Sequence, residues 1–223
     1  MAFLAPRFYP ILDVPSLQRL GVDLGSSNSQ LAKITDAFNS AGAKILQLRD
    51  KDSEPSLILA RAESIAKAHD SRKCQLILND RPDLALLAGF DGCHLGQQDL
   101  SVTGARTILP QPKILGLSTH NAEQVETGNQ TDADYLAIGP IFATSSKQNP
   151  DPVLGLEEFR RLRKLTTKPV VAIGGITRDN ARAILDAGAD SVAIIGDLYR
   201  GCTAANFAEQ VGQNIRDILA QIL

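Results

Sequence analysis

One of the short apolar runs of this sequence ends in an amide and two cations. Gln47, Arg49 and Lys51 alternate along the chain, and alternate residues of an extended strand point to the same face. Two cations on an inward face are costly to bury unless an anion meets them. The spacing therefore favours an anion-binding site, with surface charges on a fraying strand end as the plainer alternative.

Acidic residues follow the next two apolar runs. Asn79 and Asp80 come directly after one run, and Asp99 comes shortly after the other. Each aspartate suits the N-cap of a following helix, and Pro82 suits a first helical turn. Two carboxylates at neighbouring strand ends also suit Mg²⁺, which proteins often hold through one or two carboxylates together with a substrate phosphate. Capping and metal binding are therefore both open.

Hydroxyl groups and a histidine follow the fifth run. Ser118 and Thr119 suit a hydrogen bond to a phosphate or a helix cap. His120 suits proton transfer or an orienting, structural role. Residues 139–155 then form a long segment led by glycine and proline. Its hydroxyls and lysine suit an anion, and its length is typical of a lid.

Glycines follow the last two apolar runs, at Gly174, Gly175 and Gly196. Glycine lets a backbone approach a ligand closely. In many barrels the loops after strands seven and eight bind a phosphate through backbone N–H groups. A glycine pair is a weak signal alone, and its position after the seventh run strengthens it.

Eight short apolar runs alternate with eight longer segments of helical spacing, and the runs resemble strands buried on both faces of a parallel sheet. The predicted strands are residues 9–12, 45–48, 75–78, 92–95, 114–117, 135–138, 170–173 and 191–195. The predicted helices are residues 28–41, 54–69, 82–88, 101–108, 121–127, 156–165, 180–187 and 204–223. Right-handed crossovers then predict an α/β fold, a single-domain (β/α)8 TIM barrel over residues 1–223, with an open doubly wound sheet as the alternative.

Three similar junctions support repeated helix-to-strand units. Gly42, Gly89 and Gly188 each follow an alanine shortly before a predicted strand. They suit the position just past a helix end, where a left-handed backbone costs glycine little. In such a barrel all the polar residues above come to one face, where active sites form.

Composition limits the class of protein. Lys and Arg number 23 against 25 Asp and Glu, so the net charge of −2 argues against a nucleic-acid binder. No apolar run of about 18 residues predicts a membrane helix, and the first residues lack the pattern of a signal peptide. Cys74, Cys93 and Cys202 are odd in number and form no CxxC, which indicates buried, reduced thiols in a cytoplasmic protein. The sequence leaves a homo-oligomer open.

Seven segments, in this order, resemble the thiamine-phosphate synthase family. They are QLRDKD, LILNDRPDLA, DGCHLGQQD, LGLSTH, DADYLAIGPIFATSSK, VVAIGGI and GADSVAII, and the similarity runs from about residue 8 to residue 198. The resemblance implies a Mg²⁺-assisted transferase. Its substrates would be 4-amino-2-methyl-5-hydroxymethylpyrimidine diphosphate and a thiazole phosphate, and pyrophosphate would leave. The thiazole nitrogen is the nucleophile, so no protein nucleophile is expected.

The resemblance also implies roles for individual residues. The pyrimidine diphosphate would be bound by Gln47, Arg49, Lys51, Asn79 and Ser118. The metal ligands would be Asp80 and Asp99. A loop that handles both substrates would use Thr144, Ser146 and Lys147. The thiazole phosphate would be bound by Gly175, Ile195 and Gly196. The residues expected to act in catalysis are Arg49, Lys51, Ser118 and Lys147.

Two positions depart from the family pattern. Ser146 stands where the family has threonine before the lysine, which keeps the hydroxyl. Gly196 stands where a serine often follows the isoleucine of strand eight, which removes a side-chain donor and keeps the backbone N–H. The phosphate site is therefore expected to be retained and weaker.

Two other functions compete with the synthase. The related thiazole tautomerase branch lacks the carboxylate that corresponds to Asp80 and uses a histidine that matches His120, so Asp80 and Asp99 together favour the synthase. A non-catalytic barrel that binds a phosphate ligand is the third function, and the complete set of charged strand-end residues argues against it.

Overall fold

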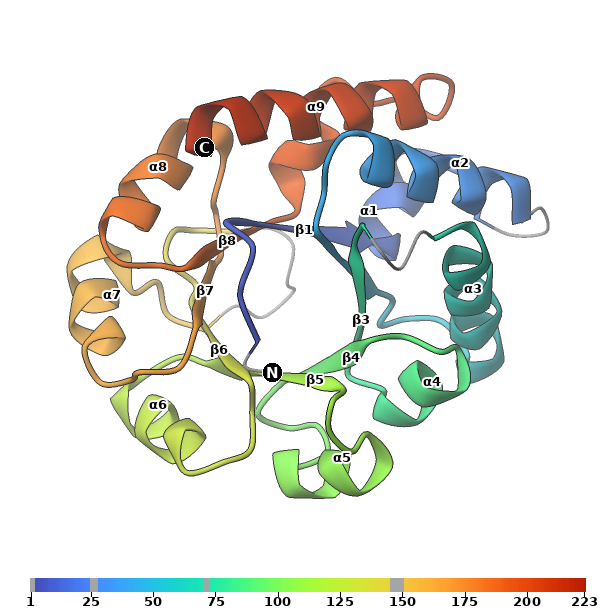
Figure 1. Cartoon of the computed structure of the whole chain (residues 1–223). Coiled ribbons are helices and arrows are strands. Elements are labelled where there is room, and N and C mark those ends of the chain that lie inside the picture. Colours follow the sequence, from blue (N-terminus) through green and yellow to red (C-terminus); the bar gives the residue numbers. More distant parts are fainter. Residues whose placement is uncertain (1–2, 25–27, 70–72, 145–150) are drawn as a thin grey trace.

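The chain forms a closed barrel of eight parallel strands surrounded by helices (Figure 1). This computed structural model describes residues 3–24, 28–69, 73–144 and 151–223. Each strand pairs with the next along the chain, and β8 returns to pair with β1 through Phe8↔Val192. The closure confirms the (β/α)8 barrel, and the open-sheet alternative is wrong because neither β1 nor β8 keeps a free edge.

All eight predicted strands are present. Their bounds are β1 Phe8–Asp13, β2 Ile45–Arg49, β3 Gln75–Asn79, β4 Gly92–Leu95, β5 Ile114–Thr119, β6 Tyr135–Ile138, β7 Val170–Ile173 and β8 Ser191–Ile194. β5 extends two residues beyond the predicted end because Ser118 and Thr119 continue the pairing with β6. The strands therefore carry several of the polar residues that the sequence analysis places just after them.

The helices follow the predicted order with two additions. Their bounds are α1 Val14–Arg19, α2 Asn28–Ser40, α3 Pro55–Ala68, α4 Pro82–Leu87, α5 Val102–Ile108, α6 Ala122–Asn129, α7 Gly155–Arg163, α8 Arg178–Asp186, the 3-10 helix η1 Gly196–Tyr199, and α9 Phe207–Ile222. α1 and η1 were not predicted, because they are too short to show helical periodicity. Gly42, Gly89 and Gly188 do have the left-handed backbone expected past a helix end, with φ of 96°, 75° and 107°.

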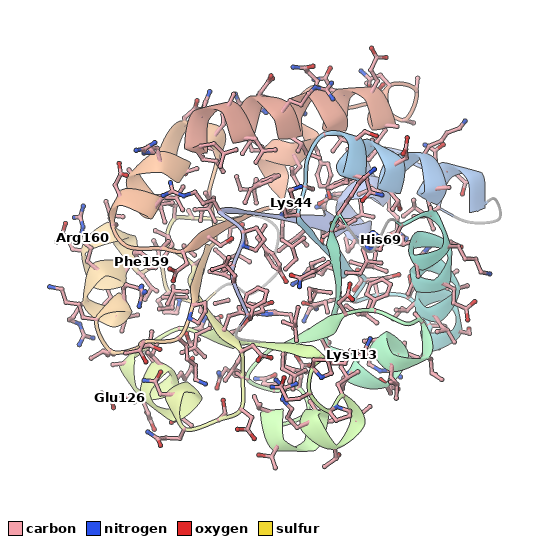
Figure 2. The ribbon with its side chains drawn as sticks, viewed as in Figure 1. Lys44, His69, Lys113, Glu126, Phe159 and Arg160 are labelled. Atoms are coloured by element: carbon pink, nitrogen blue, oxygen red, sulfur yellow. The ribbon has the colours of Figure 1, made fainter. Side chains whose placement is uncertain are left out.

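Two apolar layers hold the barrel together. The outer layer lies between strands and helices, as on α7, where Phe159 is fully buried and the adjacent Arg160 points outward (Figure 2). The inner layer fills the barrel with Tyr9, Ile11, Ile45, Ile77, Ile114, Tyr135, Ala137, Val171 and Ala193. Because side chains alternate along a strand, residues two and four positions after these members also point inward, near the carboxyl ends of the strands.

The three cysteines are buried and free, as expected. Burial raises the pKa of Cys74 to about 12 and that of Cys202 to about 11, which keeps both thiols protonated. None of the helices in the described ranges is both long and apolar enough to cross a membrane.

Candidate active site

The inner face of β2 carries the first predicted cation into the barrel mouth. Ile45 belongs to the inner layer, so Gln47 and Arg49 also point inward. Arg49 forms an ion pair with Asp13, its register partner at the end of β1. The side chain of Arg49 is 14% exposed, whereas that of Asp13 is fully buried. The cation is therefore held at the rim by a carboxylate beneath the surface, which excludes the alternative of a freely solvated surface charge.

Lys51 lies on the same side of the barrel mouth as Arg49. Its Nζ is 3.0 Å from Oδ2 of Asp80, which follows β3. Asp50, between the two cations, points the other way and pairs with Arg61 of α3 at 2.5 Å. The alternation predicted from the sequence therefore holds as far as Lys51, and the buried Asp50–Arg61 pair fixes the segment that carries it.

Asp80 does not cap the following helix. The N-cap of α4 is Arg81, which makes no side-chain capping bond. Asp80 has a φ of 64°, which non-glycine residues adopt infrequently, and its N–H donates to the carbonyl oxygen of His94 at 2.8 Å. The capping alternative for Asp80 is wrong, because this backbone conformation turns its carboxylate toward Lys51 instead.

Asp99 does not cap a helix either, because Ser101 is the N-cap of α5. Asp99 accepts the N–H of Gly96 at 2.7 Å and lies within hydrogen-bonding reach of the Asp80 carboxyl. Two causes raise the pKa of Asp99: the larger is its burial, and the second is this contact with Asp80. Two adjacent carboxylates repel each other when both are ionised, so this pair suits a cation.

Asn79 ends β3 beside this carboxylate pair. It is 8% exposed, and its Nδ2 has no hydrogen-bond partner among the residues that the structure describes. A buried amide donor without a partner is costly. Asn79 therefore suits a ligand that accepts a hydrogen bond.

A line of hydrogen bonds crosses the barrel interior from Gln47 to Ser118. Gln47 Nε2 donates to the Tyr9 hydroxyl at 3.1 Å, and the Tyr9 and Tyr135 hydroxyls lie 2.7 Å apart. Tyr135 contacts His94 Nδ1 at 3.0 Å, and His94 Nε2 contacts Ser118 Oγ at 2.9 Å. Burial lowers the pKa of His94 to about 4, so its ring is neutral. A neutral histidine ring donates through one nitrogen and accepts through the other. When the Tyr135 hydroxyl donates to His94 Nδ1, His94 Nε2 donates to Ser118 Oγ, and the Ser118 hydroxyl can still donate its own hydrogen to a ligand.

The capping interpretations of Ser118 and Thr119 are wrong, because Asn121 caps α6. Thr119 is buried and donates to the carbonyl oxygen of Ala137 at 3.0 Å. His120 Nδ1 lies 2.6 Å from the carbonyl oxygen of Gly139, to which it must donate. This contact supports the orienting role for His120.

Backbone rather than side chains lines the ends of β7 and β8. Gly175 has a φ of 64°, and a Cβ there would lie 2.5 Å from the carbonyl oxygen of Ala143. Only glycine fits this approach of two loops. A Cβ on Gly196, by contrast, would meet no atom within 4 Å. Gly196 follows Ile195 and begins η1, so its missing side chain leaves room beside the backbone.

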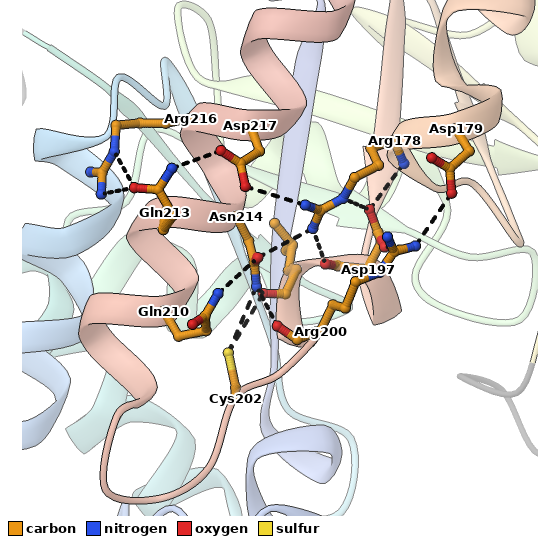
Figure 3. A network of polar contacts seen from close by, with 11 residues as sticks. Arg178, Asp179, Asp197, Arg200, Cys202, Gln210, Gln213, Asn214, Arg216 and Asp217 are labelled. Atoms are coloured by element: carbon orange, nitrogen blue, oxygen red, sulfur yellow. Dashed lines mark hydrogen bonds and ion pairs between the residues drawn. The ribbon is translucent and has the colours of Figure 1, made fainter.

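A network of polar side chains from α8 and α9 holds η1 in place (Figure 3). Asp197 accepts the backbone N–H and Nε of Arg178 at 2.9 and 2.8 Å. Asn214 of α9 donates to the carbonyl oxygens of Leu198 and Arg200, both at 2.9 Å, and accepts from Arg178 at 3.2 Å. These contacts bind the backbone of η1 to α8 and α9.

The structure brings most predicted site residues to the carboxyl ends of the strands. Lys51 contacts Asp80, and Asp80 contacts Asp99. Gln47 and Ser118 lie at the two ends of the line of hydrogen bonds in the barrel interior. Thr144 is the last residue described before a gap. The predictions for Ser146 and Lys147 lie outside the described residues.

Four residues that take part in these contacts were not predicted from the sequence, namely Asp13, Tyr9, Tyr135 and His94. Asp13 directly follows the first predicted strand, so the rule applied to the other strand ends would have found it. Tyr9 and Tyr135 are hydroxyl-bearing residues within otherwise apolar runs, a weaker signal of a polar barrel interior.

Known proteins resemble this chain along most of its length. A family model described as thiamine monophosphate synthase matches residues 22–198. The thiamine-phosphate synthases of Koribacter versatilis and Agrobacterium fabrum are 48% and 42% identical to it, covering 86% and 85% of this chain and 89% of each relative. The solved structure of thiamine phosphate pyrophosphorylase from Pyrococcus furiosus is 26% identical, with a TM-score of 0.72 and 96% of both chains covered.

The family match and the barrel agree with the resemblance found in the sequence. The likeness to these synthases confirms the expected transferase over the two competing functions. The chain belongs to the thiamine monophosphate synthase family.

Proposed function

We propose that this chain couples 4-amino-2-methyl-5-hydroxymethylpyrimidine diphosphate to a thiazole phosphate, as a single-domain cytoplasmic enzyme of thiamine biosynthesis. The observation that carries the proposal is the contact of Asp80 with Asp99 beside Lys51 at the barrel mouth. Neighbouring carboxylates and cations suit a metal-bound diphosphate better than any neutral substrate.

The carboxylate pair fits Mg²⁺. Within the described ranges no group of three or more His, Cys, Asp or Glu gathers to hold a metal. Mg²⁺ does not need such a group, because it commonly takes one or two carboxylates and completes its shell with phosphate oxygens and water. Asp80 and Asp99 would hold the ion, which when bound supplies positive charge to the diphosphate oxygens.

The chain's own cations would bind the same diphosphate. Arg49 at the end of β2 and Lys51 two residues beyond it offer N–H donors, and Lys147 would add a third cation. Asn79 offers its unpartnered Nδ2, and Ser118 offers the hydroxyl that His94 orients. Preorganised charge of this kind is commonly the largest contribution to catalysis.

The reaction then needs little proton chemistry from the protein. The bond between the pyrimidine methylene carbon and the diphosphate oxygen breaks, and its electron pair leaves with pyrophosphate. The thiazole nitrogen donates the pair that forms the new carbon–nitrogen bond. The neutral His94 and the tethered His120 agree with a site that orients donors and does not shuttle protons.

The second substrate would bind on the opposite side of the barrel mouth. Gly175, Ile195 and Gly196 offer backbone N–H groups to the thiazole phosphate, and Thr144 and Ser146 would contact both substrates. The network behind η1 supports this role because it fixes the backbone from which Gly196 donates.

The test is turnover by the purified full-length chain. With both substrates and Mg²⁺ we expect thiamine phosphate and pyrophosphate in equal amounts, and we expect EDTA to stop the reaction. Pyrophosphate release that survives chelation would remove the role of Asp80 and Asp99 as metal ligands. Isomerisation of the thiazole without coupling would overturn the synthase proposal.

A further inference from the structure

A fully buried carboxylate with no role in the proposed function lies beside Arg49. Asp13 Oδ1 pairs with Arg49. Asp13 Oδ2 accepts the backbone N–H of Ser16 at 3.1 Å and the Ser16 hydroxyl at 2.6 Å. Both carboxylate oxygens are therefore engaged, which fixes the orientation of the group that faces Arg49.

The backbone of Asp13 is also held in place. Its N–H donates to the Tyr199 hydroxyl at 2.9 Å, and that hydroxyl donates to the carbonyl oxygen of Ile11 at 3.0 Å. Tyr199 belongs to η1, so Asp13 contacts α1, β2 and η1 at once. A residue anchored on so many sides is a rigid support for a flexible partner.

An arginine side chain loses rotational freedom when it binds a ligand, and a prior contact that fixes its conformation lowers this cost. We propose that Asp13 is a positioning residue, which holds the Arg49 guanidinium in the orientation that receives the diphosphate. The inference rests on the proposed function of Arg49. A purely electrostatic view predicts the opposite effect, because Asp13 neutralises part of the charge that attracts an anion.

The variant Asp13→Asn separates positioning from helix capping. Asparagine is as good an N-cap as aspartate, so its side-chain oxygen can still accept from Ser16. It loses the charge that holds Arg49. With inorganic pyrophosphate and Mg²⁺ in isothermal titration calorimetry, we expect Kd to rise about tenfold or more in the full-length chain. An unchanged or lower Kd would overturn the inference.

Two further variants show whether Asp13 acts through Arg49. Arg49→Ala should weaken pyrophosphate binding, and adding Asp13→Asn to it should weaken binding no further, because the pair acts as a unit. Fully additive losses would overturn the inference. The matched control is Ser16→Ala, which removes the hydroxyl that contacts Asp13 and Arg19 and leaves the backbone cap and the ion pair. Its Kd should stay within about twofold of wild type, whereas a loss equal to that of Asp13→Asn would assign the effect to the cap.

Steady-state kinetics give a readout that a general structural defect would not produce. In Asp13→Asn we expect KM for the pyrimidine diphosphate to rise while KM for the thiazole phosphate is unchanged. An equal rise in both would overturn the inference. Wild-type protein that binds no pyrophosphate would overturn the proposed function as well, whereas wild-type binding with an unaffected Asp13→Asn would overturn this inference alone.

Discussion

The two halves of the barrel mouth present their polar groups in different ways. The charged half, formed by Arg49, Lys51, Asp80 and Asp99, uses side chains that pair within the site. The glycine half, formed by Gly175 and Gly196, offers backbone. A side-chain site depends on charges that a single substitution removes, whereas a backbone site depends on the elements that hold the backbone in place.

The supports of the two halves differ accordingly. Arg49 is held by Asp13 and the segment before Lys51 by the Asp50–Arg61 pair, so these contacts lie next to the cations themselves. η1 is held from behind, by Asn214 of α9. Substitutions in the charged half should therefore act on the pyrimidine diphosphate, in its binding and in the chemical step, and those behind the glycine half should act on the binding of the thiazole phosphate.

The largest effect is expected from Asp80→Asn. Asparagine tolerates the left-handed backbone of this position and removes only the charge. We expect kcat to fall about 100-fold or more, because a preorganised charge is lost. The measurement is steady-state pyrophosphate release, with a circular dichroism spectrum to verify the fold. Asp83→Asn, an exposed carboxylate paired with Arg81, is the matched control and should keep nearly full activity. A loss of only about tenfold in Asp80→Asn would place the charge stabilisation elsewhere.

A smaller and more selective effect is expected from Asn214→Ala. It leaves the carbonyl oxygens of Leu198 and Arg200 without their side-chain donor, so the backbone of η1 loosens. KM for the thiazole phosphate should rise about tenfold while KM for the pyrimidine diphosphate stays unchanged.

The control for Asn214→Ala is Gln213→Ala, on the same helix, whose exposed side chain forms hydrogen bonds with Arg216 and Asp217 and none with η1 in the described part of the chain. It should leave both KM values unchanged. Equal changes in both KM values of Asn214→Ala would mean that η1 supports both halves of the mouth, through the hydrogen bond between Tyr199 and the backbone of Asp13.

Gly196→Ser tests whether the glycine half lacks a donor. A Cβ at this position meets no atom within 4 Å, so the hydroxyl is expected to fit without strain. It should lower KM for the thiazole phosphate about threefold, the effect of one additional hydrogen bond. The matched control is Gly175→Ser, which forces a Cβ to 2.5 Å from a carbonyl oxygen and should raise that KM. A higher KM in Gly196→Ser would show that the open space at this position is needed by the substrate.

The smallest change is expected at His94 when the pH is lowered. Burial lowers its pKa to about 4, so its ring resonances in NMR should not shift between pH 8 and about pH 5.5. An unfolded histidine binds its proton near pH 6.5. The unfolded state therefore takes up this proton first, and the His94 contribution to stability is complete above about pH 6.5 and is lost as the pH falls toward 4. A midpoint near pH 6.5 in the folded protein would contradict a neutral His94 that orients Ser118.

The charged half was predictable from sequence because its residue types are unusual at strand ends. Arg49 and Lys51 stand out after an apolar run, and Asn79 and Asp80 likewise follow the next apolar run. The barrel was predictable from a different signal in the sequence. Its eight parallel strands are buried on both faces, so each of them appears as an apolar run.

The supports were not predictable in the same way. The Asp13–Arg49 pair depends on the register of β1 against β2, and the contact of Asn214 with η1 depends on how α9 packs. The positive φ of Asp80 accompanies the loss of the capping role, and aspartate alone does not indicate that conformation. Such features arise from tertiary contacts rather than from local spacing.

A crystal structure of the full-length chain with Mg²⁺ and pyrophosphate tests the central claim most directly. The ion is expected between Asp80 and Asp99, with pyrophosphate oxygens contacting it together with Arg49 and Lys51. Pyrophosphate bound at Gly175 and Gly196, or an ion away from both aspartates, would contradict the assignment of the charged half to the leaving diphosphate.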